Sequence, residues 1–322
     1  MRNKVLVFAA LLTIALTALV IQMRQGDRSV SLESHPLLSA GQMEELLALE
    51  HIQLRRGGQS VELARHDGAW GVVNYAGFPV QRERLAALLH AVRGARVIEE
   101  KTANPSHHAR LGLDPDHPDN DSFQVELKTP SDTLGLIYGN PIGSGQLVRF
   151  IDQDQVVLIS RPLAMSVNPT EWLALNVISI PMEEIASARW VYADGKVIEL
   201  VKEKQGDYNM RLAGAQSAAG NERQINTMVL ALASFTAQDV ALREELQLSE
   251  PVLSMHLETW AGVRLDASLH EQQGRYWLLV DQLETPDDHQ VSVNADKRWA
   301  YQVGIGAVES LRKDPAELSQ VP

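Results

Sequence analysis

The sequence predicts an α+β fold in which an N-terminal transmembrane helix precedes two tandem repeated domains. Each domain is expected to hold one mainly antiparallel sheet, formed by a hairpin and a strand meander, with one helix packed against it. Three observations predict this architecture: an apolar run near the N-terminus, two halves with the same order of hydrophobic patterns, and many more strand-like than helix-like segments. A length of 322 residues also fits two domains.

The first 28 residues differ in composition from the rest of the chain. Arg2 and Lys4 precede an apolar run over residues 5–21. A helix of this length spans about 25 Å, close to the thickness of the hydrocarbon core of a bilayer. The pattern predicts a single-pass anchor in the inner (cytoplasmic) membrane with a cytoplasmic N-terminus. A cleaved signal peptide is the alternative interpretation. Both interpretations place the bulk of the chain in the periplasm.

The rest of the chain divides into a linker and two domains. We expect residues 29–42 to form the linker, residues 43–178 the first α+β repeat domain, and residues 179–322 the second. In both halves a Met-Glu-Glu triplet, at 43–45 and 182–184, precedes two alternating apolar segments that flank a Gly-bearing turn. This pattern is typical of a β-hairpin.

A helix and a meander follow the hairpin in both halves. The apolar positions of 85–92 are spaced as one face of a helix, and they recur 140 positions later at 225–232. The alternating strand at 123–127 recurs at 253–257. Further along, Leu147 and Val148 are matched with Tyr276 and Trp277, and the pattern pairs two tryptophans, Trp172 and Trp299, at the ends of the halves.

Charge and cysteine content exclude several classes of function. The chain has 29 basic and 41 acidic residues, which gives a net charge of −12. Nucleic acids and anionic lipid headgroups select basic surfaces, so we expect no nucleic-acid partner. The chain has no cysteine, which excludes thiol catalysis and cysteine-based metal sites.

An acidic loop is the first candidate site. Asp114 and Asp116 begin it, and Asp119, Asn120 and Asp121 continue it. Oxygen ligands at this density suit Ca²⁺, but the loop lacks the central glycine and the distal glutamate of an EF-hand loop. We therefore interpret it as a solvated loop, and we expect no metal and no cofactor.

Other chemistry-bearing residue types match known sites only in part. His107 and His108 are adjacent and so point apart, which argues against zinc ligation together with His117. The Gly-rich stretch 139–145 contains Asn140, but a strand pattern follows it where a phosphate-binding loop needs a helix. No Ser–His–Asp group stands out, because a triad is recognised by its geometry. The sequence therefore predicts no catalytic residue.

Aromatic residues mark the segment before the first helix. Tyr75 and Phe78 flank Ala76-Gly77, and the corresponding segment of the second half, 213–220, is small and polar. Large rings are usually core anchors, and a groove for a peptide, glycan or lipid chain is the alternative. The residues expected on a partner or ligand surface are Tyr75, Phe78, Asp114, Asp116 and Asn140.

Several short motifs together resemble a known family. They are Trp70, Tyr75-Ala76-Gly77-Phe78-Pro79, the helix from Arg82 to Arg93, Leu111-Gly112-Leu113-Asp114-Pro115, Tyr138-Gly139-Asn140-Pro141, Leu147-Val148-Arg149 and Glu171-Trp172-Leu173. Their order and spacing resemble the bacterial family called domain of unknown function 4340, over residues 43–190 and more weakly beyond.

The resemblance implies a short N-terminal anchor and an extracytoplasmic part. Family members are often encoded near ABC-type transporters of the gliding-motility or auxiliary kind, which implies an accessory subunit. The family has no established catalytic residues, so none is carried over to this chain.

Three functions follow as expectations. The favoured one is a non-catalytic, membrane-anchored periplasmic accessory or scaffold subunit of an envelope complex. Its expected partners are the membrane and the permease or auxiliary subunits of an ABC transporter. The first alternative is an extracytoplasmic module that binds a lipid, glycan or peptide in a cleft between the two domains. The second alternative is a hydrolase or metal-dependent enzyme.

Overall fold

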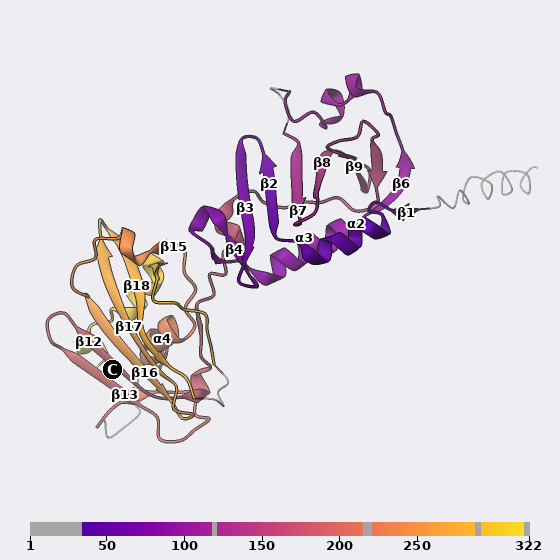
Figure 1. The fold of residues 1–322 in the computed structure, drawn as a ribbon. Helices are drawn as coiled ribbons and strands as arrows, with labels where there is room; N and C mark the ends of the chain where they lie inside the picture. The colour runs from indigo at the N-terminus through magenta and orange to yellow at the C-terminus, as the bar shows by residue number, and fades with distance from the viewer. Residues whose placement is uncertain (1–33, 118–120, 215–220, 287–290, 319–322) are drawn as a thin grey trace, which may run out of the picture. The chain divides into compact units, whose positions relative to one another are not determined.

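The computed structural model describes residues 34–117, 121–214, 221–286 and 291–318, and strands dominate it (Figure 1). Contacts divide the chain into two compact units. One unit contains the described residues up to Leu49, together with Arg55–Gly58 and Leu88–Met165. The other contains Glu50–Leu54, Gln59–Ala87 and the residues from Ser166 onward.

The first sheet has ten strands in the order β1-β6-β10-β9-β8-β7-β2-β3-β4-β5. The strands are β1 (His35–Pro36), β2 (His51–Arg56), β3 (Gln59–His66), β4 (Ala69–Val72), β5 (Phe78–Pro79), β6 (Arg96–Glu100), β7 (Phe123–Lys128), β8 (Thr133–Ile142), β9 (Gly145–Phe150) and β10 (Val157–Ile159). Gly57 and Gly58 form the two-residue turn between β2 and β3 with φ of 54° and 79°. Positive φ at both central positions is what a type I′ hairpin turn requires.

The second sheet has eight strands in the order β14-β13-β12-β16-β17-β18-β20-β15. The strands are β12 (Ile185–Tyr192), β13 (Val197–Val201), β14 (Arg211–Leu212), β15 (Asp239–Leu242), β16 (Leu253–Thr259), β17 (Arg264–Gln272), β18 (Arg275–Glu284) and β20 (Trp299–Val303). Two further strands, β11 (Ile178–Ser179) and β19 (Ser292–Val293), pair with each other. Neighbouring strands such as β7–β8 and β16–β17 pair antiparallel.

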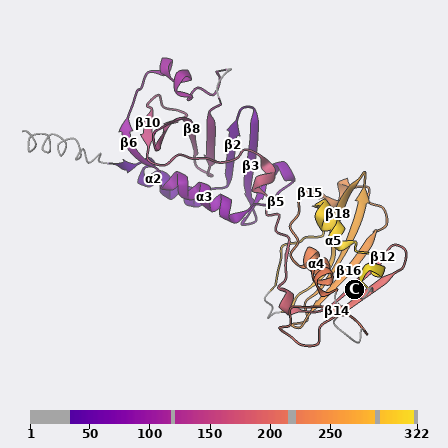
Figure 2. The same cartoon turned by 180° about the vertical axis from the view of Figure 1, so that it is seen from behind.

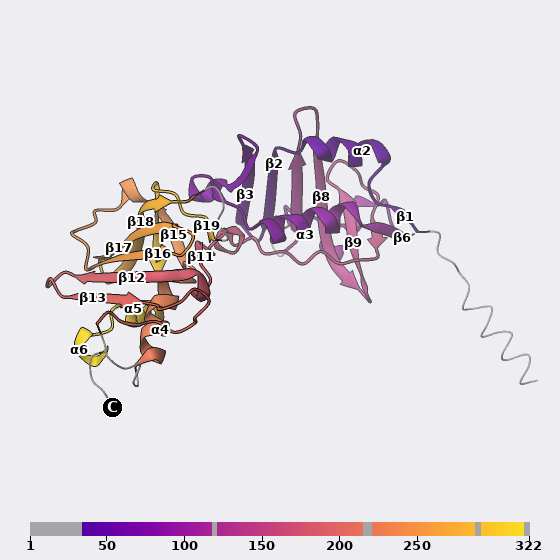
Figure 3. The same ribbon diagram turned by 90° about the horizontal axis from the view of Figure 1, so that it is seen from below.

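The described helices are few and short. They are α2 (Ala40–Glu45), α3 (Arg82–Arg93), α4 (Glu222–Ala233), α5 (Ile305–Leu311) and α6 (Pro315–Leu318). Figure 3 shows α2 and α3 against the first sheet, and Figure 2 shows α4 and α5 together on the second sheet. Leu85, Leu88 and Val92 of α3 are buried, as are Ile225, Met228, Val229 and Leu232 of α4. The helices predicted from the apolar spacing are thus confirmed.

The two sheets have corresponding strand orders. Read from β6 to β4, the first sheet runs β6-β10-β9-β8-β7-β2-β3-β4, and the second runs β15-β20-β18-β17-β16-β12-β13-β14. Along the chain, α3 comes directly before β6 and α4 comes directly before β15, so each helix precedes the first strand of its series. The backbone contact from Leu37 N to Ala95 O (2.9 Å) has a counterpart 140 positions on, from Val177 N to Phe235 O (3.1 Å).

Two details of the predicted alignment are wrong. Gln124 pairs with Ile137 and Ser254 with Ser268, so Ile137 and Ser268 correspond. Ile137 pairs with Arg149, and Ser268 pairs with Leu279, so Arg149 and Leu279 also correspond. Two residues earlier, Leu147 therefore corresponds to Trp277 and not to Tyr276. A shift by one residue moves every side chain to the other face of a sheet. Trp172 and Trp299 also do not correspond, because Trp172 ends the 3₁₀ helix η5 (Pro169–Trp172) and Trp299 begins β20.

The predicted fold class requires a correction. Within residues 34–117, 121–214, 221–286 and 291–318, none of the helices combines the length and the apolar character needed to cross a bilayer. The helix expected over residues 5–21 lies outside the described residues. The architecture is therefore two mostly antiparallel sheets with few helices, and an N-terminal transmembrane helix is not supported.

Each sheet carries a second apolar layer on the face away from its helix. On the first sheet, the described residues of 101–122, which are 101–117 and 121–122 (the first cover segment), contribute Leu111 and Leu113 to a cluster with Ile137 and Leu147. On the second sheet, residues 243–252 (the second cover segment) contribute Leu246 and Leu248 to a cluster with Trp277 and Leu279. Both cover segments join corresponding strands, β6 to β7 and β15 to β16.

Candidate functional site

The aromatic segment before α3 is packed. Phe78 is only 1% exposed, and its ring meets Trp299 edge-on with centroids 5.1 Å apart and lies 6.4 Å from Tyr301. Tyr75 ends the 3₁₀ helix η2 (Val73–Tyr75) and lies near the carboxylate of Asp239. Burial, followed by the Asp239 carboxylate, raises the pKa of Tyr75. Phe78 therefore contacts other rings, whereas Tyr75 is half-buried and lies near an acid.

Asp114, Asp116 and Asn140 lie around the first cover segment. The Asp116 N–H donates to Asp114 Oδ1 (3.2 Å), which forms a local turn. Asn140 Nδ2 donates to Arg110 O (3.3 Å), and a Cβ at Gly112 would lie 2.7 Å from Asn140 Oδ1. The structure brings these three residues to one region of the first sheet, while Tyr75 and Phe78 belong to the other compact unit.

Arg149 holds this cover segment to the sheet. Its guanidinium donates to Leu113 O (3.0 Å) and to the carbonyls of Phe150, Ile151 and Gln153 (3.0–3.3 Å). Burial lowers the pKa of Arg149, and the carboxylates of Asp154 and Asp114 oppose that change. Charge-assisted hydrogen bonds to several carbonyls fix both a side chain and the backbone around it. Arg149 therefore has a structural role.

The histidines near the acidic loop do not assemble a metal site. His108 is 5% exposed, and its Nε2 lies 3.0 Å from Asp154 O. This contact holds the first cover segment against the loop that follows β9. Across the described part of the chain, no three His, Asp or Glu side chains are close enough to hold a metal ion. Asp119 and Asn120 lie outside that part.

A Ser–His pair on the second sheet was missed from the sequence. Ser268 and His270 are two residues apart on β17 and therefore share a face. His270 Nε2 lies 3.0 Å from Ser268 Oγ, and Nδ1 lies 2.7 Å from Ser249 O. A carbonyl only accepts, so Nδ1–H donates to Ser249 and Nε2 accepts from the Ser268 hydroxyl. The S-x-H spacing on an alternating strand was the available signal.

This pair has the contact of a nucleophile and a base, but it lies beneath the second cover segment. Ser268 is 5% exposed and His270 is 8% exposed. The group that orients the imidazole is a backbone carbonyl, and a catalytic triad uses a carboxylate in that place. The geometry fits a structural role, in which the His270 side chain holds the second cover segment against β17 by a hydrogen bond.

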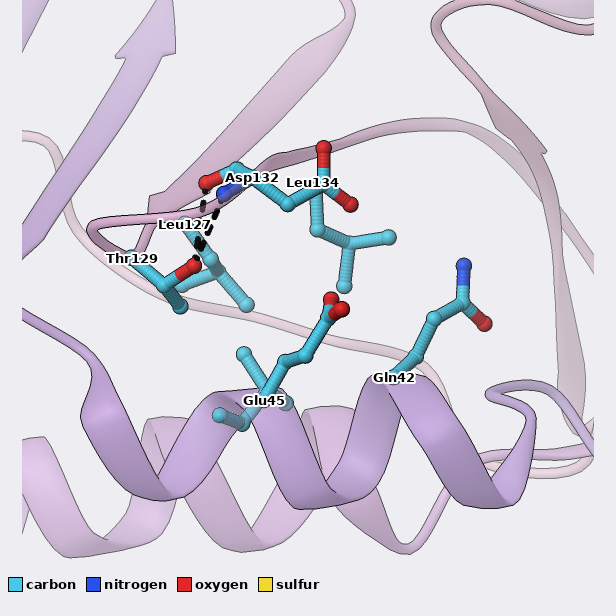
Figure 4. A pocket seen from close by; sticks show the side chains of 7 residues that line it. Gln42, Glu45, Leu127, Thr129, Asp132 and Leu134 are labelled. Carbon is cyan, nitrogen blue, oxygen red and sulfur yellow. Dashed lines mark hydrogen bonds between the residues drawn. The ribbon is translucent and has the colours of Figure 1, made fainter.

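A small open pocket lies between α2 and the turn that joins β7 to β8 (Figure 4). Its enclosed space is only about 10 Å³, which is about the room that one water molecule needs and far below the usual volume of small-molecule sites. The helical side contributes Gln42, Glu45 and Leu46. The turn contributes Leu127, Thr129, Asp132 and Leu134. Three leucines thus form an apolar floor, and two carboxylates lie at its rim.

Comparison with known proteins identifies a family and nothing narrower. The family model described as "Domain of unknown function (DUF4340)" matches residues 70–251, which is more than half of the chain. No curated protein and no solved structure matches the chain. The matched range contains Phe78, Asn140, Arg149 and the Ser249 end of the second cover segment. The chain therefore belongs to the DUF4340 family.

Proposed function

We propose that this chain is a non-catalytic accessory or scaffold subunit of an envelope complex. It lies in the periplasm, at the inner membrane, and binds the permease or an auxiliary subunit of an ABC-type transporter. The resemblance that led to the family also supports the transporter link, because family members are often encoded beside such transporters. A membrane-spanning helix is not part of the proposal.

One observation carries the non-catalytic part of the proposal. Two polar residues of the family motifs hold the fold: Arg149 binds backbone carbonyls, and Asn140 binds Arg110 O. Their glycine neighbour Gly139 allows Leu111 O to approach, because a Cβ there would lie 2.5 Å from that oxygen. Side chains that bind backbone carbonyls are not directed at a substrate.

The charge of the chain favours a protein partner with a basic surface. A net charge of −12 attracts basic patches and repels acidic ones. On the second sheet, the exposed ends of Arg189 and Glu199 and of Arg264 and Glu258 pair with each other, which leaves a polar, hydrated face. Such a surface fits a reversible protein contact better than a buried apolar interface.

Crosslinking in intact cells, followed by affinity purification of the full chain in mild detergent, tests the proposal. We expect a permease, an ATPase or an auxiliary transporter subunit to be recovered in defined stoichiometry. Recovery of the chain alone under several mild conditions would contradict an accessory role. Hydrolytic activity lost in Ser268→Ala, in a chain that remains folded, would favour the enzyme alternative.

A further inference from the structure

We propose that one outer face of α3 binds an extended acidic segment of a protein partner. This face (the α3 face) lies beside the buried stripe of the helix, and its residues follow helical spacing. They are Arg82, Ala86, Leu89, His90 and Arg93, of which Leu89 is half-buried and the others are exposed. The inference rests on the proposed function, because it assigns a surface and a chemistry to the contact with a partner protein.

The second sheet covers the corresponding face of α4 with its own chain. Asn209 and Met210 belong to the connection between β13 and β14, residues 202–210. Asn226 of α4 donates to Asn209 Oδ1 (2.7 Å) and accepts from Met210 N (3.0 Å). Asn209 Nδ2 also donates to Glu222 Oε2 (2.7 Å). As a result Asn226 is only 7% exposed, so this helix face can bind a stretch of non-helical chain.

The first sheet leaves its counterpart uncovered. The connection that corresponds to residues 202–210 is the two-residue turn Asp67-Gly68 between β3 and β4. A turn of this length cannot fold back over a helix. Ala86 and Arg82, which correspond to Asn226 and Glu222 at the spacing of 140, are both exposed. The surface that the second sheet fills from its own chain is therefore open on the first sheet.

The arginines of the α3 face have no ion-pair partner within the described residues. Arg84 pairs with Glu171 (3.1 Å), whereas no described carboxylate lies within 4.0 Å of Arg82 or Arg93. Arg82 is in the first turn of α3, where a cation opposes the helix dipole, and α4 has Glu222 at that position. Helix stability therefore explains Arg93 in the last turn but not Arg82.

The exchange of Glu222 for Arg82 reverses the hydrogen bond that this face can form. On α4 the Glu222 carboxylate accepts the amide N–H of Asn209. A guanidinium only donates, so the group bound at Arg82 must be an acceptor, and a carboxylate forms the strongest bond of this kind. Ala86 replaces Asn226 and has no polar atom in its side chain, so an apolar side chain suits the centre of the face.

The spacing of the α3 face matches an extended segment. Arg82, Ala86 and His90 are four residues apart, which is about 6 Å along a helix. Side chains on one face of an extended chain are two residues apart, or about 6.6 Å. A segment with the pattern acid-x-apolar-x-acid therefore places one carboxylate at Arg82, the apolar side chain over Ala86, and the other carboxylate at His90 and Arg93.

The test uses the full chain with two matched pentapeptides, Glu-Ala-Leu-Ala-Glu and Gln-Ala-Leu-Ala-Gln, both acetylated and amidated. They differ only in the two carboxylates. We expect the acidic peptide to shift the NMR signals of Ala86, Ala87 and His90 with a dissociation constant in the millimolar range. The neutral peptide should bind at least about fivefold more weakly, because it forms no ion pair. Equal binding of the two peptides would overturn the proposal.

Variants localise the binding. Arg82→Gln with Arg93→Gln removes both guanidinium groups and should lower the affinity for the acidic peptide to that for the neutral one. Arg223→Gln with Arg275→Gln removes two exposed arginines elsewhere and should leave both affinities within about twofold of the wild type, since distant charges are screened. Ala86→Gln keeps a good helix former and adds bulk, so it should weaken both peptides. If the first double variant binds the acidic peptide as the wild type does, the proposal fails.

Purification from cells separates this inference from the proposed function. If the wild type recovers a transporter subunit and the variant with both Arg82→Gln and Arg93→Gln does not, both are supported. If both chains recover the subunit equally, the proposal for the α3 face fails and the accessory function stands. If the acidic peptide binds but the chain is always recovered alone, the function fails and the surface is supported by its titration.

Two further comparisons of the same variant with the wild type test other occupants. Binding to phosphatidylglycerol vesicles that the variant loses would make a lipid surface the occupant and overturn the protein partner. A dimer in sedimentation that the variant dissociates would make a second copy the occupant, with the same consequence. We expect vesicle binding and oligomeric state to be the same in both chains.

Discussion

The two cover segments occupy the same topological position and are held by different chemistry. The first cover segment approaches β8 at Gly139, where a Cβ would lie 2.5 Å from Leu111 O, and Arg149 fastens it through backbone carbonyls. On the second sheet the residue that corresponds to Gly139 is His270, which fills this space and binds Ser249 O itself. Leu279 corresponds to Arg149 and is buried in the apolar layer.

The comparison shows that one strand position, Gly139 in β8 or His270 in β17, determines how closely the backbone of the cover segment can approach the sheet. A glycine admits the backbone of the cover but provides no side chain to hold it, so a fastening residue is needed on the neighbouring strand. A histidine keeps the backbone further away and holds it directly. Motif residues such as Gly139 and Arg149 are therefore explained by packing, without reference to a substrate.

The largest effect is expected for Gly139→Ala. The new Cβ would meet Leu111 O at 2.5 Å and Leu113 Cγ at 2.7 Å, and the backbone oxygen cannot move aside without lifting the cover. We expect a loss of about 3 kcal/mol in the free energy of unfolding, measured by urea denaturation. Gly306→Ala in α5 is the matched control, because nothing lies within 4 Å of that position and a small gain is expected. Equal destabilisation by both changes would refute the close approach.

Arg149→Met should have the next largest effect. The change keeps most of the apolar stem and removes the hydrogen bonds to Leu113 O and to the three following carbonyls. Water can form hydrogen bonds to some of these carbonyls in place of the arginine, so we expect a loss of about 2 kcal/mol in the free energy of unfolding. Hydrogen exchange should accelerate at the Leu113 amide, which is bonded to His108 O, and not within α4.

Arg264→Met on the second sheet provides the control for Arg149. The Arg264 side chain is 55% exposed and pairs with Glu258 and Glu284. Exposed ion pairs contribute little, so a loss of less than about 1 kcal/mol is expected. Similar losses for the two arginine variants would mean that Arg149 acts as an ordinary surface charge.

His270→Ala should cost less, about 1.5 kcal/mol, because one main fastening of the second cover segment is lost along with some packing. The bond to Ser249 O (2.7 Å) disappears, and exchange should accelerate at the Val252 amide, which donates to Leu269 O. His256→Ala is the control on the same face of the sheet, on the neighbouring strand β16, since that half-exposed histidine contacts Asp266 of β17 and no cover segment. Faster exchange at Val252 in the control would argue against a specific fastening.

The sequence predicted the parts of this fold that depend on periodicity. The helical spacing of Leu85, Leu88 and Val92 marked α3, and the corresponding residues marked α4, because a helix buries one stripe of side chains. The alternation of Phe123, Val125 and Leu127 marked β7, because one face of a strand is buried. The periodicity of apolar residues was sufficient to predict these elements, because each one buries a single face that can be recognised within its own stretch of sequence.

The parts that depend on contacts between distant residues could not be predicted. The misalignment of Trp277 arose because an apolar strand that is buried on both faces shows no alternation to fix its register. The pocket depends on where α2 meets the β7–β8 turn, and the Ser268–His270 pair acquires its role only from Ser249, which lies on a different segment. No single stretch of sequence contains either arrangement.

Tyr138 gives the last and smallest effect, and it appears only in alkali. Tyr138 is 2% exposed, whereas the corresponding residue of the second sheet is Leu269, which cannot ionise. Burial raises the pKa of Tyr138 above its ordinary value of 10.0. Above pH 10 the unfolded chain therefore ionises this residue while the folded chain keeps it neutral, so stability falls as pH rises.

Tyr138→Phe should remove this contribution, up to about 1.4 kcal/mol for each pH unit above 10. The difference in unfolding free energy between pH 7 and pH 11 should therefore shrink by about 1.4 kcal/mol in the variant. Phe123→Leu alters the ring that packs 6.0 Å from Tyr138 without removing an ionisable group, so it should lower stability equally at both pH values. If the two variants show the same pH dependence, ionisation of Tyr138 does not distinguish the first sheet from the second.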